Sequence, residues 1–363
     1  MILALTFVAS LLLSTLVVWL VRRLARQRHW LDHPNERSSH EVPTPRLGGV
    51  GIWLATAVVS AAVALATAPR PLGHTYLWPV LVGGLIMAAT GLADDLLPRG
   101  LRPAIKYAGQ LAAAVATVAV ADAFFLPSIL SHVSRSTAGE FLVAVLIGAI
   151  QVLFLTAYAN FANFMDGSDG LVAGVSVIVL GAFAFLLRGS DRELAGAALA
   201  AAAATLGLLA FNRPAASIFM GDSGSLFLGF LLAALVLAWA AGADPHDATF
   251  AALARLRLSR LGTMAILTAP LWVDAVTTLF SRALRRRRLT EAHRDHLYQR
   301  MLRLGKSPTM VCAVYYAYGA ACAVAALLAT ANALLGGILG AALVAGGIAA
   351  VLGAHRVGLA VEP

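Results

Sequence analysis

Charged residues are scarce in this chain of 363 residues, where they occupy only 12% of positions. No polar stretch is long enough to form a separate soluble domain, so we expect a single domain over residues 1–363. Hydrophobic residues make up 60% of the sequence, and apolar runs of about 18 residues or more recur from end to end. These runs lack the apolar–polar alternation of an outer-membrane barrel. The composition predicts an all-α, polytopic membrane protein.

Cysteine is almost absent as well. The two cysteines, Cys312 and Cys322, lie on one predicted helix. Ten helical residues separate them by about 15 Å, too far for a disulfide bond between them. The first apolar run, residues 2–21, has no basic segment before it and no small-residue cleavage site, so we expect a retained span and not a signal peptide.

The apolar runs predict a bundle of about 10–11 transmembrane helices. They cover roughly residues 2–21, 47–68, 76–93, 104–121, 141–159, 171–187, 194–211, 226–243, 262–280, 310–331 and 334–354. Most of the 27 Lys and Arg residues fall in the odd-numbered connections or the C-terminal tail. Positively charged loops stay in the cytoplasm, which places the N-terminus outside and these connections inside. The net charge of +9 therefore follows membrane topology, and we expect no nucleic-acid partner.

Polar chemistry is concentrated in four short segments on the predicted cytoplasmic side. They are Asp94-Asp95, Asn160 to Gly170, Gly221 to Ser225 and His293 to His296. Carboxylates, amides, histidines and arginines at one membrane face indicate a site where a soluble anion meets a membrane-bound partner.

Asp94 and Asp95 end the third predicted span. Two adjacent carboxylates repel each other, and Mg²⁺ would offset their charge because it prefers oxygen ligands and bridges phosphates. One carboxylate could instead act as a base with a raised pKa. A solvated helix end is the structural alternative.

The next two segments also suggest a cation and an anionic ligand. Residues 160–170 hold two Asn, two Asp and two Gly without one Lys or Arg, and the glycines let backbone amides approach a ligand. The turn before the eighth span offers helix N–H groups to an anion. Asp222 within that turn would repel phosphate unless a cation bridged them. Ordinary loop and helix-capping roles remain the alternatives.

The last segment places His293 and His296 on one face if it is helical, with Arg294 nearby. Zinc binding is disfavoured because no cysteine and no third histidine lie close in sequence. A cluster that binds diphosphate fits better. Asp274, inside the ninth predicted span, is either functional or paired with a neighbour.

These motifs resemble the polyprenyl-phosphate N-acetylhexosamine-1-phosphate transferase superfamily, glycosyltransferase family 4. The resemblance covers nearly the whole chain and rests on motifs in matching order. They are Pro43 to Gly49, Asp94-Asp95, Lys106 to Gln110, Asn160 to Gly170, Asn212 to Ser225 and the histidine loop. The loops Pro34 to His40 and Glu291 to Arg300 are most similar to the branch that initiates O-antigen assembly. The chain lacks the three consecutive histidines of the phospho-MurNAc-pentapeptide translocases, which disfavours a muramyl-pentapeptide substrate.

The resemblance implies an enzyme that transfers a sugar 1-phosphate from a UDP-N-acetylhexosamine to undecaprenyl phosphate and releases UMP. It implies Mg²⁺, with Mn²⁺ as a substitute, a bacterial inner-membrane location and a role in lipopolysaccharide or other cell-surface polysaccharide synthesis. A homodimer is left open, and so is the identity of the amino sugar. The rivals are a peptidoglycan-type transferase, a CDP-alcohol phosphotransferase and a secondary transporter. The transporter is disfavoured because the acids sit at span ends and no internal repeat is found.

The resemblance also implies residue roles. Asp222 and Asp166 would ligate the metal, and Asp94 and Asp95 would position or deprotonate the lipid phosphate, so that Asp94, Asp95 and Asp166 form the catalytic set. The residues implied to bind substrate are Asn160, Asn163, Asp169, Asn212, Phe219, Lys106, His293, Arg294 and His296.

Overall fold

The computed structural model describes residues 1–32, 42–67, 76–97, 99–130, 137–241, 250–288 and 293–359. Within these ranges the chain is helical except for short connections and one small antiparallel sheet, in which Leu31 pairs with Pro45 and Asp32 with Thr44. The elements are α1 (Ile2–Gln27), β1 (Leu31–Asp32), β2 (Thr44–Pro45), α2 (Gly49–Thr67), α3 (Leu77–Leu96), α4 (Pro103–Leu130), α5 (Thr137–Met165), α6 (Leu171–Leu187), α7 (Arg192–Asn212), α8 (Asp222–Ala241), α9 (Phe250–Leu267), α10 (Ala269–Leu284), α11 (Leu297–Arg303), α12 (Pro308–Ala331) and α13 (Ala333–Leu359).

The predicted polytopic helical fold is confirmed. Among the described residues, nine helices are long and apolar enough to cross a membrane, and the bent pair α9–α10 raises the number to ten. The apolar helix α6, with 17 residues, is shorter. The sidedness predicted from the basic loops remains a prediction.

The ninth predicted span, residues 262–280, is not one helix. It breaks near Thr268 into α9 and α10, which meet at an angle of 83°. Pro270 explains the break, because proline lacks an N–H and its ring clashes with the carbonyl of the preceding turn. The polar groups at the break find partners: the Trp272 indole donates to the Ala265 carbonyl at 2.9 Å, and the Tyr158 and Thr268 hydroxyls lie 2.7 Å apart.

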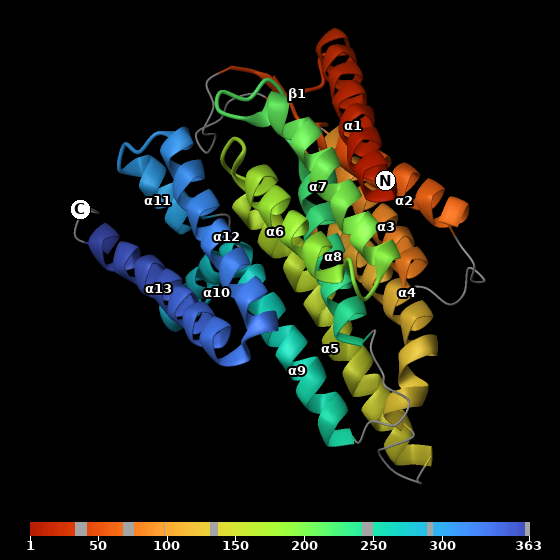
Figure 1. Ribbon diagram of the computed structural model, residues 1–363. Helices are drawn as coiled ribbons and strands as arrows, with labels where there is room; N and C mark the ends of the chain where they lie inside the picture. The colour runs from red at the N-terminus through yellow and green to blue at the C-terminus, as the bar shows by residue number, and fades with distance from the viewer. Residues whose placement is uncertain are drawn as a thin grey trace.

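Helix α8 is the central element of the bundle. Its most apolar stretch is 89% buried, against 17% for the corresponding stretch of α5. It packs against α2, α3, α5, α6, α7 and α9. Figure 1 shows α10 to α13 at one side of the bundle, where α12 lies next to α6. In a membrane, close packing of small side chains takes the place of the hydrophobic drive between helices. The position of α8 therefore fixes where its first residue, Asp222, lies.

Helix α3 approaches the start of α8 so closely that only glycine fits between them. A Cβ atom on Gly91 would lie 2.4 Å from the Asp222 carbonyl oxygen. The contact brings the C-terminal turn of α3, with Asp94 and Asp95, against the N-terminal turn of α8.

We expect Gly91→Ala to destabilise the protein by about 1–3 kcal/mol, because the added methyl must push α3 away from backbone atoms of α8. The matched control is Gly196→Ala on α7, where a Cβ would meet nothing within 4 Å. Alanine should be neutral or stabilising there because it favours a helix by up to about 1 kcal/mol. Thermal unfolding in detergent would measure both variants, and equal effects would contradict the close approach.

Candidate active site

Four helix ends that are distant in sequence meet at one end of the bundle. The C-terminal turn of α3 carries Asp94 and Asp95, and the N-terminal turns of α4 and α8 carry Lys106 and Asp222. The C-terminal turn of α5 carries Asn163 and leads to Asp166. The hydrogen bonds described below join these ends, so the predicted convergence of the acidic segments is found in the structure.

The Asp95 carboxylate caps the start of α8. Its Oδ1 accepts a hydrogen bond from the Asp222 N–H at 3.0 Å, and its Oδ2 accepts one from the Ser223 N–H at 2.9 Å. Asp95 is only 8% exposed. The first N–H groups of a helix lack partners within the helix and carry a partial positive charge, so a buried carboxylate is stabilised there. Asp95 thus locks α3 to α8 as well as contributing to the acidic cluster.

Asp222 is the centre of the polar contacts. Its Oδ2 forms an ion pair with the Lys106 ammonium, and its Oδ1 accepts a hydrogen bond from the Asn163 amide at 2.9 Å. The same ammonium lies 3.5 Å from Asp94 Oδ2, while Asp94 Oδ1 accepts the Leu101 N–H at 2.7 Å. Lys106 therefore bridges two of the predicted site acids, and its contacts in the structure are with carboxylates.

Asp166 follows α5 and lies near enough to the same cluster for its carboxyl group to interact electrostatically with Asp222 and Asp95. Burial, together with the negative charges of Asp222, Asp95 and Asp169, raises the pKa of Asp166 well above its usual value. A carboxylate that is disfavoured in this way would be relieved by a cation.

The residues present fit Mg²⁺, which takes one or two carboxylates and completes its shell with water and substrate phosphates. Asp222 and Asp166 supply such a pair. The described part of the chain contains no group of three or more His, Cys, Asp or Glu residues able to hold a metal by itself. The predicted magnesium site is therefore one that a phosphate ligand would have to complete, and it stays a prediction.

Arg46 was not singled out from the sequence, yet it closes one side of the cluster. Its Nε donates to the Asp95 carbonyl at 3.0 Å, and its Nη2 donates to the Leu97 carbonyl at 3.1 Å. Carbonyls at a helix C-terminus lack intrahelical partners, and a cation there also offsets the helix dipole. Its place in the segment Pro43 to Gly49, directly before a span, was the available signal.

The segment around β2 also holds the turn before α8. The Phe219 N–H donates to the Pro45 carbonyl at 2.7 Å, and the Phe219 carbonyl accepts the Gly48 N–H at 2.9 Å. Gly221, at the end of this turn, has φ of +74°, which favours glycine, and a Cβ there would lie 2.6 Å from Asp95 Oδ2. Phe219 is half-buried beside the cluster, and the stacking on uracil that the resemblance implies is a prediction.

Asn212 and Asp169 join two of the site loops. The Asn212 side chain accepts the Gly170 N–H at 3.1 Å and donates to the Ile218 carbonyl at 3.0 Å, and it is only 3% exposed. Asp169 Oδ2 accepts the Ala216 N–H at 2.9 Å. Both side chains hold the loop after α5 against the loop before α8. The substrate contacts that the resemblance implies for them stay predictions.

Asn160 lies one helical turn before Asn163 and faces α4. Its amide donates to the Gln110 Oε1 at 2.8 Å and accepts from the Gln110 Nε2 at 3.3 Å. This reciprocal pair aligns α5 with α4 and so sets Asn163 opposite Lys106. We infer that Asn160 shapes the site, and the substrate contact that the resemblance implies for it stays a prediction.

The histidine loop packs against the end of α5. The His296 ring stacks on Phe164 and Tyr298, with centroid distances of 6.3 and 5.9 Å, and the Tyr298 hydroxyl donates to the Phe164 carbonyl at 3.0 Å. His293 lies beside His296 at 5.1 Å between centroids. The structure therefore brings the fourth polar segment to the other three.

His293 and Arg294 are more accessible than His296, which is 3% exposed. Burial, followed by the positive charges of His296 and Arg282, lowers the pKa of His293 to about 4. His293 is therefore a neutral imidazole near neutral pH. The carbonyl of Arg294 accepts from Arg303 at 2.9 Å, which fixes the backbone at this point of the loop.

An apolar cavity of about 280 Å³ lies elsewhere, between α3, α4, α5, α8 and α9. Its wall includes Tyr76 and Ala241, at the ends of α3 and α8 opposite to the acidic cluster. The cavity is thus separate from the candidate active site.

Comparisons with known proteins agree with the motifs. The family model described as glycosyl transferase family 4 matches residues 77–240. The chain is 29% identical over 317 residues to a probable undecaprenyl-phosphate N-acetylglucosaminyl 1-phosphate transferase of Bacillus subtilis (strain 168), covering 86% of this chain and 81% of the relative. It is 32% identical over 345 residues to a decaprenyl-phosphate N-acetylglucosaminephosphotransferase of Mycobacterium leprae (strain TN), covering 88% and 83%. A phospho-N-acetylmuramoyl-pentapeptide-transferase of Geobacillus kaustophilus (strain HTA426) is 30% identical over 246 residues, covering 64% and 73%.

The lowered pKa of His293 predicts a stability change with pH. The unfolded histidine titrates near its usual pKa of about 6.5, so between pH 6.5 and about 4 the unfolded chain binds a proton that the folded chain does not. Stability should fall as the pH drops through this window. We expect His293→Gln to lose less of its thermal stability between pH 7 and pH 5 than the wild type does. His29→Gln, at an exposed histidine, is the control, and a loss in His293→Gln equal to that of the wild type would contradict the shift.

Proposed function

Because the chain belongs to glycosyl transferase family 4, the polyprenyl-phosphate N-acetylhexosamine-1-phosphate transferase superfamily, we propose that it transfers N-acetylhexosamine 1-phosphate from a UDP-sugar to a polyprenyl phosphate. The observation that carries the proposal is the meeting of Asp94, Asp95, Asp166 and Asp222 in one cluster, in which the Lys106 ammonium bridges Asp94 and Asp222. Acids from separate spans at one end of a membrane bundle suit a reaction between a soluble anion and a lipid phosphate.

In this reaction an oxygen of the lipid phosphate attacks the β-phosphorus of the nucleotide sugar. A new O–P bond forms, the bond between the β-phosphorus and the bridging oxygen breaks, and UMP leaves. Such a transfer needs alignment of two phosphates and neutralisation of their charge more than covalent help. Asp94 faces the ammonium of Lys106 at one side of the cluster, where it would orient the incoming phosphate.

Asp222 and Asp166 would hold the magnesium ion. When bound, this ion would supply charge neutralisation on the diphosphate. Asn163 keeps the Asp222 carboxylate in place through its hydrogen bond, and Lys106 provides a positive charge for the same oxygens when no other cation is present. His293 and Arg294, on the accessible side of the histidine loop, would contact the phosphates or the sugar.

The named relatives support a finer proposal. The name of the Bacillus protein specifies transfer of N-acetylglucosaminyl 1-phosphate to undecaprenyl phosphate. The name of the Mycobacterium protein specifies an N-acetylglucosaminephosphotransferase that uses decaprenyl phosphate. We propose undecaprenyl phosphate as acceptor, a UDP-N-acetylhexosamine such as UDP-GlcNAc as donor, and initiation of a cell-surface polysaccharide as the role. The histidine loop of this chain, with His293 and His296 separated by two residues, favours this over a muramyl-pentapeptide donor.

The direct test supplies purified protein with undecaprenyl phosphate and a panel of radiolabelled UDP-sugars, including UDP-MurNAc-pentapeptide. We expect label to enter an organic-extractable lipid with release of UMP, and we expect Asp222→Ala to abolish both.

The matched control is Asp191→Ala. Asp191, like Asp222, is an aspartate at the start of a helix; it caps α7 by accepting the Glu193 and Leu194 N–H groups at 3.1 and 3.0 Å, at the end of α7 away from the acidic cluster. It should retain activity and lose only about 1 kcal/mol of stability. Uptake of the sugar without a lipid product would favour a transporter, and near-normal turnover by Asp222→Ala would exclude its metal role.

Removal of divalent cations gives a separate expectation. Since Asp222 and Asp166 would share the ion with a substrate phosphate, excess EDTA should abolish product formation, and Mg²⁺ or Mn²⁺ should restore it. Full activity in EDTA would show that the Lys106 ammonium alone neutralises the cluster.

A further inference from the structure

We propose that Asp274 is a positioning residue that acts through His296, so that the two form one functional unit behind the histidine loop. The proposal rests on the proposed transferase function, in which the loop contacts the donor. Asp274 lies on α10, outside the acidic cluster of Asp94, Asp95, Asp166 and Asp222, and none of the roles described above uses it.

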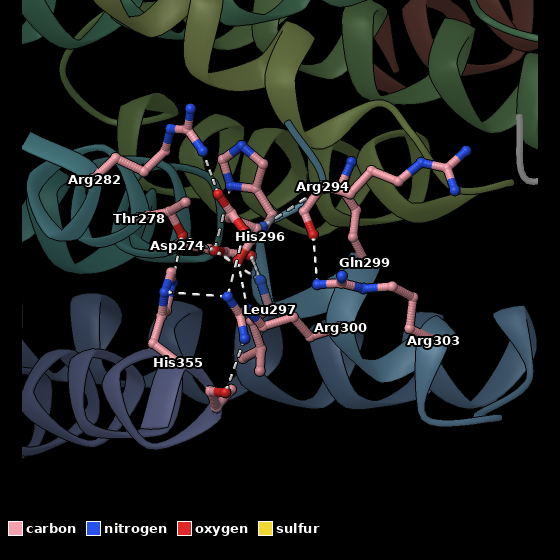
Figure 2. A network of polar contacts seen from close by, with 12 residues as sticks. Asp274, Thr278, Arg282, Arg294, His296, Leu297, Gln299, Arg300, Arg303 and His355 are labelled. Carbon is pink, nitrogen blue, oxygen red and sulfur yellow. Dashed lines mark hydrogen bonds and ion pairs between the residues drawn. The ribbon is translucent and has the colours of Figure 1, made fainter. Parts of the chain in front are cut away.

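Asp274 is buried, with 3% of its surface exposed, and its oxygens contact the start of α11 as well as residues of α10 and α12. Both of its oxygens accept the Leu297 N–H at 3.0 Å, at the first residue of α11. Its Oδ1 also accepts the Thr278 hydroxyl at 3.0 Å, and its Oδ2 accepts the Tyr315 hydroxyl at 2.7 Å. Figure 2 shows Asp274 in the middle of this network, directly below the His296 ring.

The pairing with His296 distinguishes Asp274 from a simple structural acid. His296 Nδ1 lies 3.4 Å from Asp274 Oδ1, and each side chain is only 3% exposed. A carboxylate beside one ring nitrogen of a histidine orients the ring. The carboxylate of Asp274 therefore sets the orientation of His296.

A second layer of the network fixes the same loop from α13. Arg300 donates to the Ala354 carbonyl at 3.1 Å and to Asp295 Oδ1 at 3.4 Å, and Asp295 is also paired with Arg282. The His355 ring joins Arg300 to Thr278, at 3.5 and 3.4 Å (Figure 2). The histidine loop is therefore held by contacts from α10 and from α13, and Asp274 is the residue that contacts His296.

Several charged or titratable groups lie around Asp274 and the histidine loop. They are Asp274 itself and Arg282 on α10, Asp166 after α5, His293 and Asp295 in the loop, Tyr298 on α11, Tyr315 on α12, and Arg300 and His355 behind the loop. Among them Asp274 alone forms an ion pair with His296 in the described residues.

The test is a double-mutant cycle with Asp274→Asn and His296→Gln, read as kcat/KM for lipid product formation. We expect Asp274→Asn to lower kcat/KM about 10- to 100-fold. If Asp274 acts through His296, the double variant should be no slower than the slower single variant, within about threefold. Losses that multiply would overturn the proposal.

The separate values of kcat and KM add a readout that a purely structural role would not move. If Asp274 acts by orienting His296, Asp274→Asn should change kcat and KM in the same proportion as His296→Gln does. Tyr315→Phe is the control, because it removes a neutral donor from the same carboxylate; it should reduce thermal stability and change kcat and KM much less than Asp274→Asn. A change in kcat and KM in Asp274→Asn that differs in proportion from that in His296→Gln would overturn the proposal.

If Asp274→Asn does not fold, Asp274→Glu provides the second variant. It keeps the charge and displaces the carboxylate by one methylene, so we expect a lower kcat/KM; an unchanged kcat/KM would overturn the proposal. A wild-type protein that makes no labelled lipid with any donor would refute the proposed function itself. A wild type that makes the product while the cycle is additive would refute the role of Asp274 alone.

Discussion

The capping of α8 by Asp95 is the interaction on which the rest of the site depends. A carboxylate from the end of one helix satisfies two N–H groups at the start of another, 127 and 128 residues away in sequence. This charge–dipole contact is strong because both partners are shielded from water. It requires glycine at two places, Gly91 on α3 and Gly221 before α8, since a side chain at either would separate the helices. This contact, once formed, largely fixes the positions of Asp94, Asp222 and Lys106.

Much of this arrangement could be predicted from the sequence. Counting apolar runs placed Asp94, Asp166, Asp222 and His293 on one side, because an even number of crossings separates each pair, and the order of the motifs indicated the family. The individual roles were harder to predict. Asn212 and Asp222 are both polar residues at the ends of apolar runs, so the sequence does not distinguish them. In the structure, however, the oxygen and the nitrogen of the Asn212 amide both form hydrogen bonds with backbone groups. The role of Arg46 in the site could not be predicted from the sequence, since an arginine before a span is also an ordinary topology signal.

The bend between α9 and α10 was missed for a physical reason. Residues 262–280 are apolar throughout except for a few polar side chains, so composition alone describes a straight span. Pro270 gave a signal, but prolines are tolerated in membrane helices when neighbours satisfy the freed carbonyls. The indole of Trp272 does so here, and that contact cannot be read from a linear sequence. The consequence is that Asp274 lies beside the histidine loop.

Three helices, α2, α4 and α8, begin beside the acidic cluster, at Gly49, Pro103 and Asp222. A helix start carries roughly half a positive charge, so the carboxylates are interleaved with fixed dipoles of the opposite sign. A bare anion would meet repulsion from the acids. A ligand that carries both a cation and negative groups meets attraction from the acids for the cation and from the helix starts for the negative groups. Its capture should consequently depend weakly on ionic strength, unlike the steering of a simple polyanion toward a basic patch.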